Sequence, residues 1–550
     1  MRILCVICCI GSWISCLTIN RVGWAPLPIL PLLLLPHYTD IIIITLPTRK
    51  MGKKSNAKRS GGRGGGVTKL LPHARSQLSA LVDDIFKKCT KVPPVAAAST
   101  PAQEWAEYME VYQLIENVRE LEKDIQLPTY PRMEQVGPFM SWMKEKNIMV
   151  TGVEIWDFGA HGLGLQAKED LKQGQEVLAV PLEAMLTEDT AKKSYLGPLM
   201  ERDPILQKMG NVCLALHVLG ERVNSQSPWE PYLRILPHSY STILYSTPQQ
   251  LQGLQSSPVL EEAVKLFRII ARQYSYFYRI LHSLPEAKSW PIKDYFTFDA
   301  YRWAVSTVMT RQNRIPMSGS DGVKSDDDNV EVGQMALIPG WDMTNHQQGT
   351  FSTDYDSKRG NSVCLAQRDF HSGEEFTIHY TNRPNSDLFL HNGFVYPENQ
   401  NDSLGVKLGV SKKDALYQEK VELLMCLGLP SSGTFQLVPG PHPISPQLLA
   451  FTRIFCMDKE SLEKWRGDGV RAKGLMHEDC DVGTSTQDKT WAFLHTRVAL
   501  LTRAYPTSLE DDVAALTSAS DFPALVRSLL ICEKKILRDA TTYLAARIAK

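Results

Sequence analysis

The sequence predicts an α+β fold, in which short β-strands are interrupted by a long helical insert and followed by an all-α C-terminal region. Three observations carry this prediction. Short runs with β patterning and flanking glycines occur at 148–181 and again at 335–379. Between them, from about 190 to 300, apolar residues recur at helical spacing. The chain becomes helical again from about Lys412 to its C-terminal end.

The composition is that of an ordinary globular chain. Hydrophobic residues are 43% and charged residues 22% of the 550 positions, so each domain can bury a core. Lys+Arg and Asp+Glu are both 60, which argues against a nucleic-acid binder that works through a global basic field. The 11 cysteines are too sparse for a disulfide scaffold, and those from Cys89 onward stand singly, as is typical of reduced intracellular proteins.

The first hundred residues differ from the rest. The stretch 3–19 carries no charge and is typical of a targeting segment or a marginal membrane anchor. At Met51 the composition changes abruptly to a basic, Gly/Ser-rich stretch. We therefore expect residues 1–50 to be an apolar extension that does not contribute to the folded protein, with targeting or anchoring as the alternatives. Residues 51–99 are expected to form a basic disordered tail.

Ordered structure is expected to begin at Thr100. The run Thr100-Pro101-Ala102-Gln103 has the pattern of a capping box with proline in the first helical position. Apolar and aromatic residues then follow at helical spacing and predict an N-terminal helical segment within 100–150. The expected strands that follow are 148–151, 153–155, 163–167, 176–181, 335–339, 362–367 and 375–379.

Helices are expected between the two groups of strands. The clearest is at 264–281. Its stretch 272–279 holds four aromatic residues and two arginines, which could form a stacking surface for single-stranded nucleic acid, but the helical spacing of the apolar residues favours core packing. Another helix is expected at 301–311. The polar stretch 318–331 is expected to be a loop.

Four separated segments hold unusual polar and small residues in or beside the expected strands. They are His161-Gly162-Leu163-Gly164-Leu165, Arg311-Gln312-Asn313, Trp341-Asp342-Met343-Thr344-Asn345-His346 and Tyr380-Thr381-Asn382-Arg383. Each is weak alone. The G-x-G is too short for a dinucleotide fingerprint, because no third glycine follows and no helix opens there.

Together, and in this order, the four segments resemble the SET-domain methyltransferases. Three further runs, 274–278, 309–313 and 336–342, resemble the branch of this family that methylates a histidine of actin, which is related to the plant Rubisco large-subunit methyltransferases. The resemblance runs from Met51 to near Lys550, and residues 1–50 have no counterpart in it. It implies a SET domain over 151–396, with the helical insert inside it, and a helical substrate-binding domain over 405–550.

Many SET lysine methyltransferases carry a zinc-binding cysteine cluster after the domain, and this chain departs from that pattern. Cys426, Cys456, Cys480 and Cys532 are isolated and cannot supply a compact tetrahedral site. His477 and Cys480 have the spacing of half a zinc site, but no second pair lies nearby. We expect no metal site.

The resemblance implies S-adenosylmethionine as the cofactor. Gly162 and Gly164 would let the backbone approach it, because a Cβ atom would intrude. Arginine suits the carboxylate at the amino-acid end. The position before the first glycine, glutamate-like in the family, is His161 here. The implied cofactor-binding residues are Arg132, His161, Gly162, Leu163, Arg311, Asp342, Met343, Thr344, Asn345, His346, Asn392, Gly393 and Phe394.

The resemblance also implies the catalytic and substrate-binding residues. Tyr380 would pack on the target ring, and Asn313 would bond the far imidazole nitrogen and so fix the tautomer. Trp341 and Arg383 would line the substrate groove. Core packing for Trp341, a surface salt bridge for Arg383 and a helix cap for Asn313 are the open alternatives.

The resemblance implies a protein-histidine N-methyltransferase that modifies the tele nitrogen of a histidine of actin. One alternative is a lysine methyltransferase acting on a histone or another protein, with Asn313 as the discriminating residue. Another is a non-catalytic SET scaffold that binds actin. We expect a monomer in the cytoplasm, with the nucleus as a second compartment, and neither a nucleic-acid partner nor stable membrane association.

Overall fold

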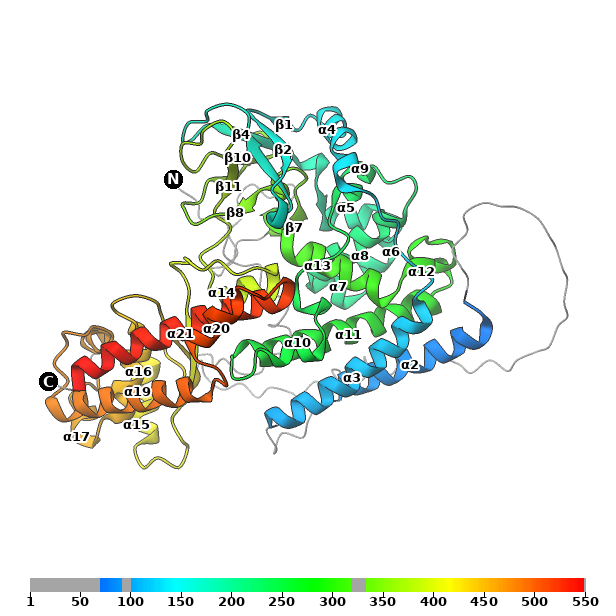
Figure 1. The fold of residues 1–550 in the computed structure, drawn as a ribbon. Helices are drawn as coiled ribbons and strands as arrows, with labels where there is room; N and C mark the ends of the chain where they lie inside the picture. Colours follow the sequence, from blue (N-terminus) through cyan, green and yellow to red (C-terminus); the bar gives the residue numbers. More distant parts are fainter. Residues whose placement is uncertain (1–69, 92–99, 318–332, 468, 549–550) are drawn as a thin grey trace, which may run out of the picture.

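The computed structural model describes residues 70–91, 100–317, 333–467 and 469–548. The expectations for residues 1–50 and for the loop at 318–331 lie outside the described residues. Within the described ranges, no helix is both long enough and apolar enough to cross a membrane. Figure 1 shows two lobes, one holding most strands and the helical insert, the other the C-terminal helices α15 to α21.

The expected disordered tail is wrong for its second half, because residues Pro72–Thr90 form helix α2. Its buried residues Leu78, Val82, Ile85 and Cys89 follow helical spacing and make an apolar stripe. This stripe packs against α3 (Pro101–Glu122) and α11 (Val259–Ser283), and the three helices lie side by side (Figure 1). The basic, Gly/Ser-rich stretch just before α2 concealed the stripe, although the charged residues of α2 itself all lie on its solvent face.

The capping box at the start of α3 is confirmed. The Gln103 backbone N–H donates to Thr100 Oγ1 at 3.3 Å, and the Thr100 backbone N–H donates to Gln103 Oε1 at 2.8 Å. These two bonds satisfy backbone donors that a helix start otherwise leaves unpaired.

The strands before residue 400 that the structure describes form three small sheets. In the first sheet the strands lie in the order β1 (Met149–Val150), β4 (Glu176–Pro181), β10 (Asn361–Leu365) and β9 (Thr353–Asp356). In the second the order is β2 (Val153–Asp157), β3 (Leu163–Ala167), β11 (Glu375–Ile378) and β8 (Asn345–His346). In the third it is β5 (Leu186–Thr187), β7 (Gly333–Leu337) and β6 (Asn313–Pro316). Strands β8 and β11 pair in parallel, whereas the other pairs are antiparallel. The parallel pair sets Asn345 and His346 beside the strand that leads to Tyr380.

The insert is helical, as predicted. Its main helices are α5 (Glu188–Lys193), α6 (Gly197–Arg202), α7 (Pro204–Lys208), α8 (Gly210–Val223), α9 (Glu230–Ile235), α10 (Pro248–Gln252), α11, α12 (Ile292–Tyr295) and α13 (Phe298–Arg311). Helix α13 is nearly all buried and packs on α8. It ends at Arg311 and leads directly into β6, which begins at Asn313.

The C-terminal lobe is mainly helical but is not all-α. It contains α15 (Tyr417–Cys426), α16 (Pro446–Cys456), α17 (Lys459–Glu463), α18 (Gly469–Ala472), α19 (Thr484–Ala504), α20 (Leu509–Leu516) and α21 (Asp521–Ile548). Strand β12 (Leu404–Gly409) precedes α15 in the sequence and β13 (Ser432–Leu437) follows it. The two strands pair in antiparallel fashion. Burial alternates along both strands, but each is short and carries glycine, which weakens the pattern in the sequence.

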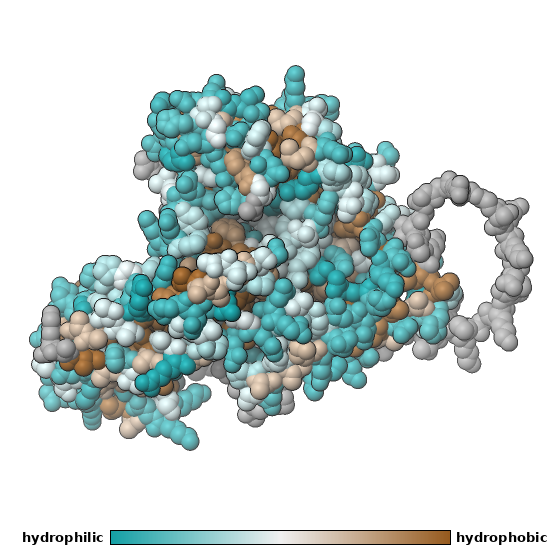
Figure 2. Space-filling view, viewed as in Figure 1, coloured by the Kyte–Doolittle hydropathy of each residue, from teal (hydrophilic) through white to brown (hydrophobic). Residues whose placement is uncertain are grey.

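The two lobes meet along α21 and the start of α11. Ser256 Oγ donates to the Ala504 carbonyl at 2.6 Å, and Lys407 Nζ lies 2.5 Å from Glu261 Oε2. Helix α21 also packs on α14 (Asn385–Asp387), which follows the Tyr380 segment. Figure 2 shows the surface hollowed between the lobes, with hydrophobic residues near the hollow.

Candidate active site

The four polar segments singled out in the sequence converge in the strand-rich lobe. Tyr380 follows β11, while Asn345 and His346 form β8 on the neighbouring strand. Arg311 reaches the 341–346 segment from the end of α13, and His161 reaches β11 from the turn before β3. Residues far apart in sequence are therefore brought together by sheet pairing and by one helix end.

Tyr380 is held at two points. Its hydroxyl donates to the Thr344 carbonyl at 2.5 Å, and its backbone N–H donates to His346 Nδ1 at 3.1 Å. Burial raises the pKa of the Tyr380 phenol, so its hydroxyl stays protonated. Burial, with the charges of His379 and Arg383, lowers the pKa of His346 to about 4. His346 is therefore neutral and keeps Nδ1 as an acceptor.

An aromatic wall surrounds the His346 ring. The ring centroid lies 5.1 Å from that of Tyr380, 5.8 Å from Phe394 and 5.2 Å from Tyr396. Tyr396 was not among the predicted residues, since a single tyrosine in a loop carries no distinctive pattern. These rings pack around His346, whose Nδ1 accepts from the Tyr380 backbone.

A second network lies around Asp342. Tyr232 on α9 donates to Asp342 Oδ2 at 2.5 Å, and Arg311 Nη1 donates to the Asp342 carbonyl and lies 3.6 Å from Oδ2. Burial raises the pKa of Asp342, and the Arg311 charge opposes that rise. Burial lowers the pKa of Arg311, but the Asp342 charge and nearby tyrosines outweigh it, so the net shift is upward. Sequence patterns missed Tyr232, which sits in the short helix α9 without a distinctive pattern.

Two atoms in this network have no protein partner. Arg311 Nε and Asp342 Oδ1 are both buried and unpaired. Each such atom costs about 1–3 kcal/mol when nothing satisfies it. Other buried atoms of the described residues, among them Arg302 Nε, are unpaired too, so Arg311 and Asp342 stand out by lying together beside the Tyr380 segment. A buried guanidinium with an open donor fits a ligand carboxylate.

Arg132 adds a second cation to this place. Its Nε donates to the Ile235 carbonyl at 2.7 Å. Burial, followed by repulsion from Arg311, lowers the pKa of Arg132 to about 10, so the two guanidiniums lie close enough to feel each other. Gly162 has φ 72° and ψ −154°, a conformation essentially restricted to glycine, and a Cβ there would lie 3.9 Å from Arg132 Nη1. These residues fit the amino-acid end of S-adenosylmethionine.

Gly164 makes room for protein side chains. A Cβ at Gly164 would lie 3.0 Å from Asn345 Nδ2 and 3.1 Å from Glu375 Oε1. Its expected role toward the cofactor stays a prediction. Leu163 beside it is buried in the core.

The remaining cofactor candidates lie on two short elements. Met343 and Thr344 are buried beside Asp342. Asn392 ends the π-helix Leu388–Asn392, and its Nδ2 donates to the Thr310 carbonyl at 3.5 Å. Gly393 has φ 76°, and a Cβ there would lie 2.9 Å from the Ser241 carbonyl carbon. This turn is therefore packed tightly against the chain before η6 (Ile243–Tyr245).

The predicted substrate residues differ in their surroundings. Trp341 is only 6% exposed and packs in the hydrophobic core, which favours the packing alternative over groove lining. Arg383 donates to Thr381 Oγ1 at 3.1 Å and to Asn392 Oδ1 at 3.2 Å. Asn313 Nδ2 donates to the Arg311 carbonyl at 3.3 Å, a helix-end contact like the one the cap alternative describes. Roles for Asn313 and Arg383 toward a substrate stay predictions.

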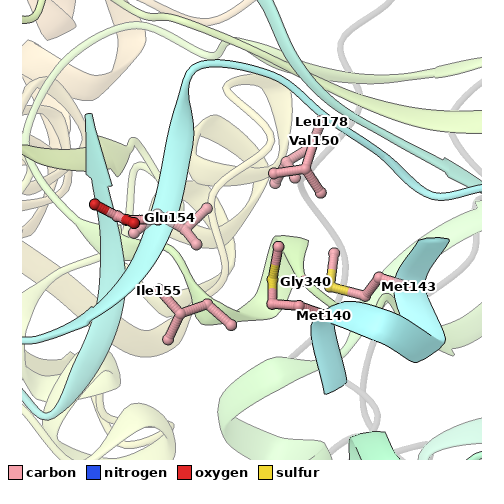
Figure 3. A pocket seen from close by; sticks show the side chains of 8 residues that line it. Met140, Met143, Val150, Glu154, Ile155, Leu178 and Gly340 are labelled. Atoms are coloured by element: carbon pink, nitrogen blue, oxygen red, sulfur yellow. The ribbon is translucent and has the colours of Figure 1, made fainter. Parts of the chain in front are cut away.

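An enclosed cavity nearby is not this site. It is lined by Met140, Met143, Val150, Glu154, Ile155, Leu165, Leu178 and Gly340 (Figure 3). Gly340 has φ 85°, and a Cβ there would lie 2.5 Å from Met143 Cε. The methionines of α4 (Val136–Glu145) thus support the turn before the 341–346 segment, and the cavity is a packing gap.

The chain matches known proteins along most of its length. Residues 162–381 match the family model of the SET domain, and residues 411–537 match that of the Rubisco LSMT substrate-binding domain. It is 38% identical to the actin-histidine N-methyltransferase of Danio rerio, over 90% of this chain and 80% of that protein. The Homo sapiens actin-histidine N-methyltransferase is 37% identical, over 89% of this chain and 80% of that protein.

Solved structures share the fold. Rubisco LSMT bound to sinefungin and monomethyllysine superposes with a TM-score of 0.60 at 19% identity, covering 75% of this chain and 92% of that one. Rubisco LSMT bound to AdoMet gives a TM-score of 0.58 at 20% identity, covering 76% and 92%. The identity and coverage shared with the curated relatives establish more than the fold. The chain belongs to the SET-domain family of actin-histidine N-methyltransferases.

Proposed function

We propose that this protein is an S-adenosylmethionine-dependent protein-histidine N-methyltransferase that acts on actin. One observation carries the proposal: a buried arginine with an open donor lies beside the segment that holds Tyr380. Arg311 Nε is unpaired next to Asp342, and Thr344, two residues further on, accepts the Tyr380 hydroxyl. The relatives named for actin-histidine methylation support the substrate.

The chain's own residues bind, orient and exclude water. When bound, the cofactor supplies a methyl group on a positively charged sulfur. Arg311 and Arg132 bind its carboxylate, and Gly162 lets the backbone approach it. The transfer needs a neutral nitrogen lone pair opposite the sulfur, so the gain comes from alignment in a dry polar pocket. Tyr380 is not the base, because its proton is committed to the Thr344 carbonyl.

The position of methylation follows from the tautomer. Asn313 lies two residues after Arg311, so its amide sits near the cofactor arginine. We propose that its oxygen accepts the N–H of the target imidazole's pros nitrogen, which leaves the lone pair on the tele nitrogen. After transfer the ring is cationic and loses the proton on the pros nitrogen to solvent.

The test uses two peptides that differ only in having His or Lys at the target position. The rate on the His peptide should fall as the pH drops through the imidazole pKa, about 6.5, and stay flat to about pH 8. The Lys peptide should be slower and gain rate above about pH 8, because free lysine titrates near 10.4. Preference for the Lys peptide at every pH would replace this proposal with lysine methylation.

Asn313→Ala should lower histidine methylation and relax the preference toward lysine. Asn117→Ala is the matched control, because Asn117 is exposed on α3 and remote from the site. Equal losses in both variants would remove Asn313 from the mechanism.

We propose that the protein works as a monomer in the cytoplasm, with the nucleus as a second compartment. The cysteines that the structure describes are free thiols, which suits a reducing compartment. Fractionation of cells and size-exclusion chromatography of the purified protein test the two statements.

A further inference from the structure

Glu375, which no sequence pattern singled out, lies between two predicted cofactor segments. Its Oε1 accepts from Asn345 Nδ2 at 2.6 Å, and its Oε2 lies 3.4 Å from His161 Nδ1. Its side chain is 20% exposed, while that of His161 is 70% exposed. The carboxylate thus connects the turn before β3 with strand β8 from the strand between them.

The surroundings of Glu375 are shaped to hold this contact. The absent Cβ of Gly164 leaves the space that the Asn345 amide and the Glu375 carboxylate fill. Glu375 itself is fixed by the antiparallel register of β11 with β3, opposite Gln166. The carboxylate is therefore placed by the sheet rather than by a flexible loop.

Two carboxylates lie near Tyr380, but they differ in how far neighbouring groups neutralise their charge. Asp342 is compensated by Arg311, 3.6 Å away. Glu375 is bonded to a neutral amide and to the exposed His161. After burial, the charges of Asp342 and Glu375 both help to raise the pKa of Tyr380, while Arg311 opposes them. The field of Glu375 therefore reaches the place where methyl transfer is proposed.

We propose that Glu375 is the residue that selects the charged cofactor over its spent form. Its carboxylate attracts the sulfonium of S-adenosylmethionine more than the neutral thioether of S-adenosylhomocysteine, and its hydrogen bond positions Asn345. In the family a glutamate-like residue precedes the first glycine, but here that position is His161, so β11 supplies the carboxylate. The inference rests on the proposed cofactor. Its consequence is exchange of the spent cofactor for a fresh one after each turnover.

The test is calorimetric binding of three ligands to the purified full chain. S-adenosylmethionine and sinefungin carry a positive charge at the reacting position, whereas S-adenosylhomocysteine carries none. Glu375→Gln keeps the size and an oxygen that can accept from Asn345, but removes the charge. We expect the preference for the two cations over the thioether to fall about tenfold.

Two further variants separate charge from structure. Glu375→Asp keeps the charge but shortens the reach to Asn345, so all three ligands should weaken while the preference persists. Glu374→Gln removes the adjacent carboxylate, which is 40% exposed and pairs with Arg368. It should change neither the affinities for the three ligands nor the preference for the two cations. Equal weakening of all three ligands by Glu375→Gln would overturn the inference and leave Glu375 a structural residue. Failure of the unaltered protein to bind any of them would overturn the proposed function instead.

Discussion

Two buried acidic residues, Asp342 in the strand-rich lobe and Asp512 in the C-terminal lobe, differ in how completely their carboxylates are paired. Their side chains are 1% and 0% exposed, and each lies beside a basic partner. Asp512 is contacted by Lys534, Arg527 and the Thr507 hydroxyl, and both of its oxygens are bonded. Asp342 keeps one oxygen unpaired, as its partner Arg311 keeps one nitrogen.

The complete network around Asp512 serves stability, whereas the incomplete network around Asp342 leaves atoms that can serve a function. Lys534 Nζ also donates to the Thr507 carbonyl at 2.7 Å and the Ser508 carbonyl at 3.2 Å, so the C-terminal network is complete within the protein. A complete network ties α20 to α21 and needs nothing more. An incomplete one costs folding free energy unless a ligand completes it, so Arg311 and Asp342 are candidates for binding a ligand.

The largest expected effect tests the complete network. Asp512→Ala leaves the buried Lys534 ammonium without its carboxylate, so the free energy of unfolding should fall by about 3–5 kcal/mol. Urea unfolding of this variant and of Asp488→Asn, an exposed site on α19, measures the effect. Equal free energies of unfolding in the two variants would contradict the stabilising role of the complete network.

The next effect tests the incomplete network. Arg311→Ala removes the open donor, so affinity for S-adenosylmethionine should fall by about 2–5 kcal/mol. Arg302→Ala is the matched control, because Arg302 is a mostly buried arginine of the same helix that also has an unpaired Nε, but it pairs with Asp299 and not with Asp342. It should affect stability without affecting binding. Unchanged affinity in folded Arg311→Ala would place the cofactor elsewhere.

The smallest effect tests the seam between the lobes. Glu533 on α21 accepts from Ser257 at 2.8 Å and from Tyr505 at 2.9 Å, and burial raises its pKa from 4.5 to about 7. The folded state then holds a proton that the unfolded state releases, so this contribution is full below about pH 4.5 and lost as the pH rises through about 7.

Glu533→Gln should remove that dependence. Between these two pKa values, the free energy of unfolding of the unaltered protein should fall relative to that of the variant as the pH rises. The fall should be at most about 1.4 kcal/mol per pH unit. Glu510→Gln, at the exposed start of α20, is the control. Parallel stability profiles for the unaltered protein and Glu533→Gln would show that Glu533 does not titrate in this range.

Local patterns predicted the local structure well. Strands β3 and β4 have the predicted bounds, and the capping box at Thr100 forms as expected. The patterns failed where composition outweighed periodicity, as in α2, whose narrow apolar stripe follows a basic, Gly/Ser-rich stretch. They failed also at β12 and β13, whose glycines interrupt a short alternation.

For the site, the sequence supplied the residue types but not all of their partners. Arg311, Asp342 and Tyr380 stood out because they sit in unusual polar segments. Tyr232 and Glu375 did not, since a tyrosine in a short helix and a glutamate on a strand are ordinary. Their importance comes only from what they contact.

By itself, the sequence determined the family, most helical and strand segments and the polar segments from which the site is built. The tertiary structure alone decided how those residues meet. The parallel pairing of β8 with β11 places Asn345 and His346 beside the Tyr380 strand, and the end of α13 brings Arg311 to Asp342. Periodicity encodes which face of an element is buried, whereas pairing between distant strands depends on the packing of the whole lobe.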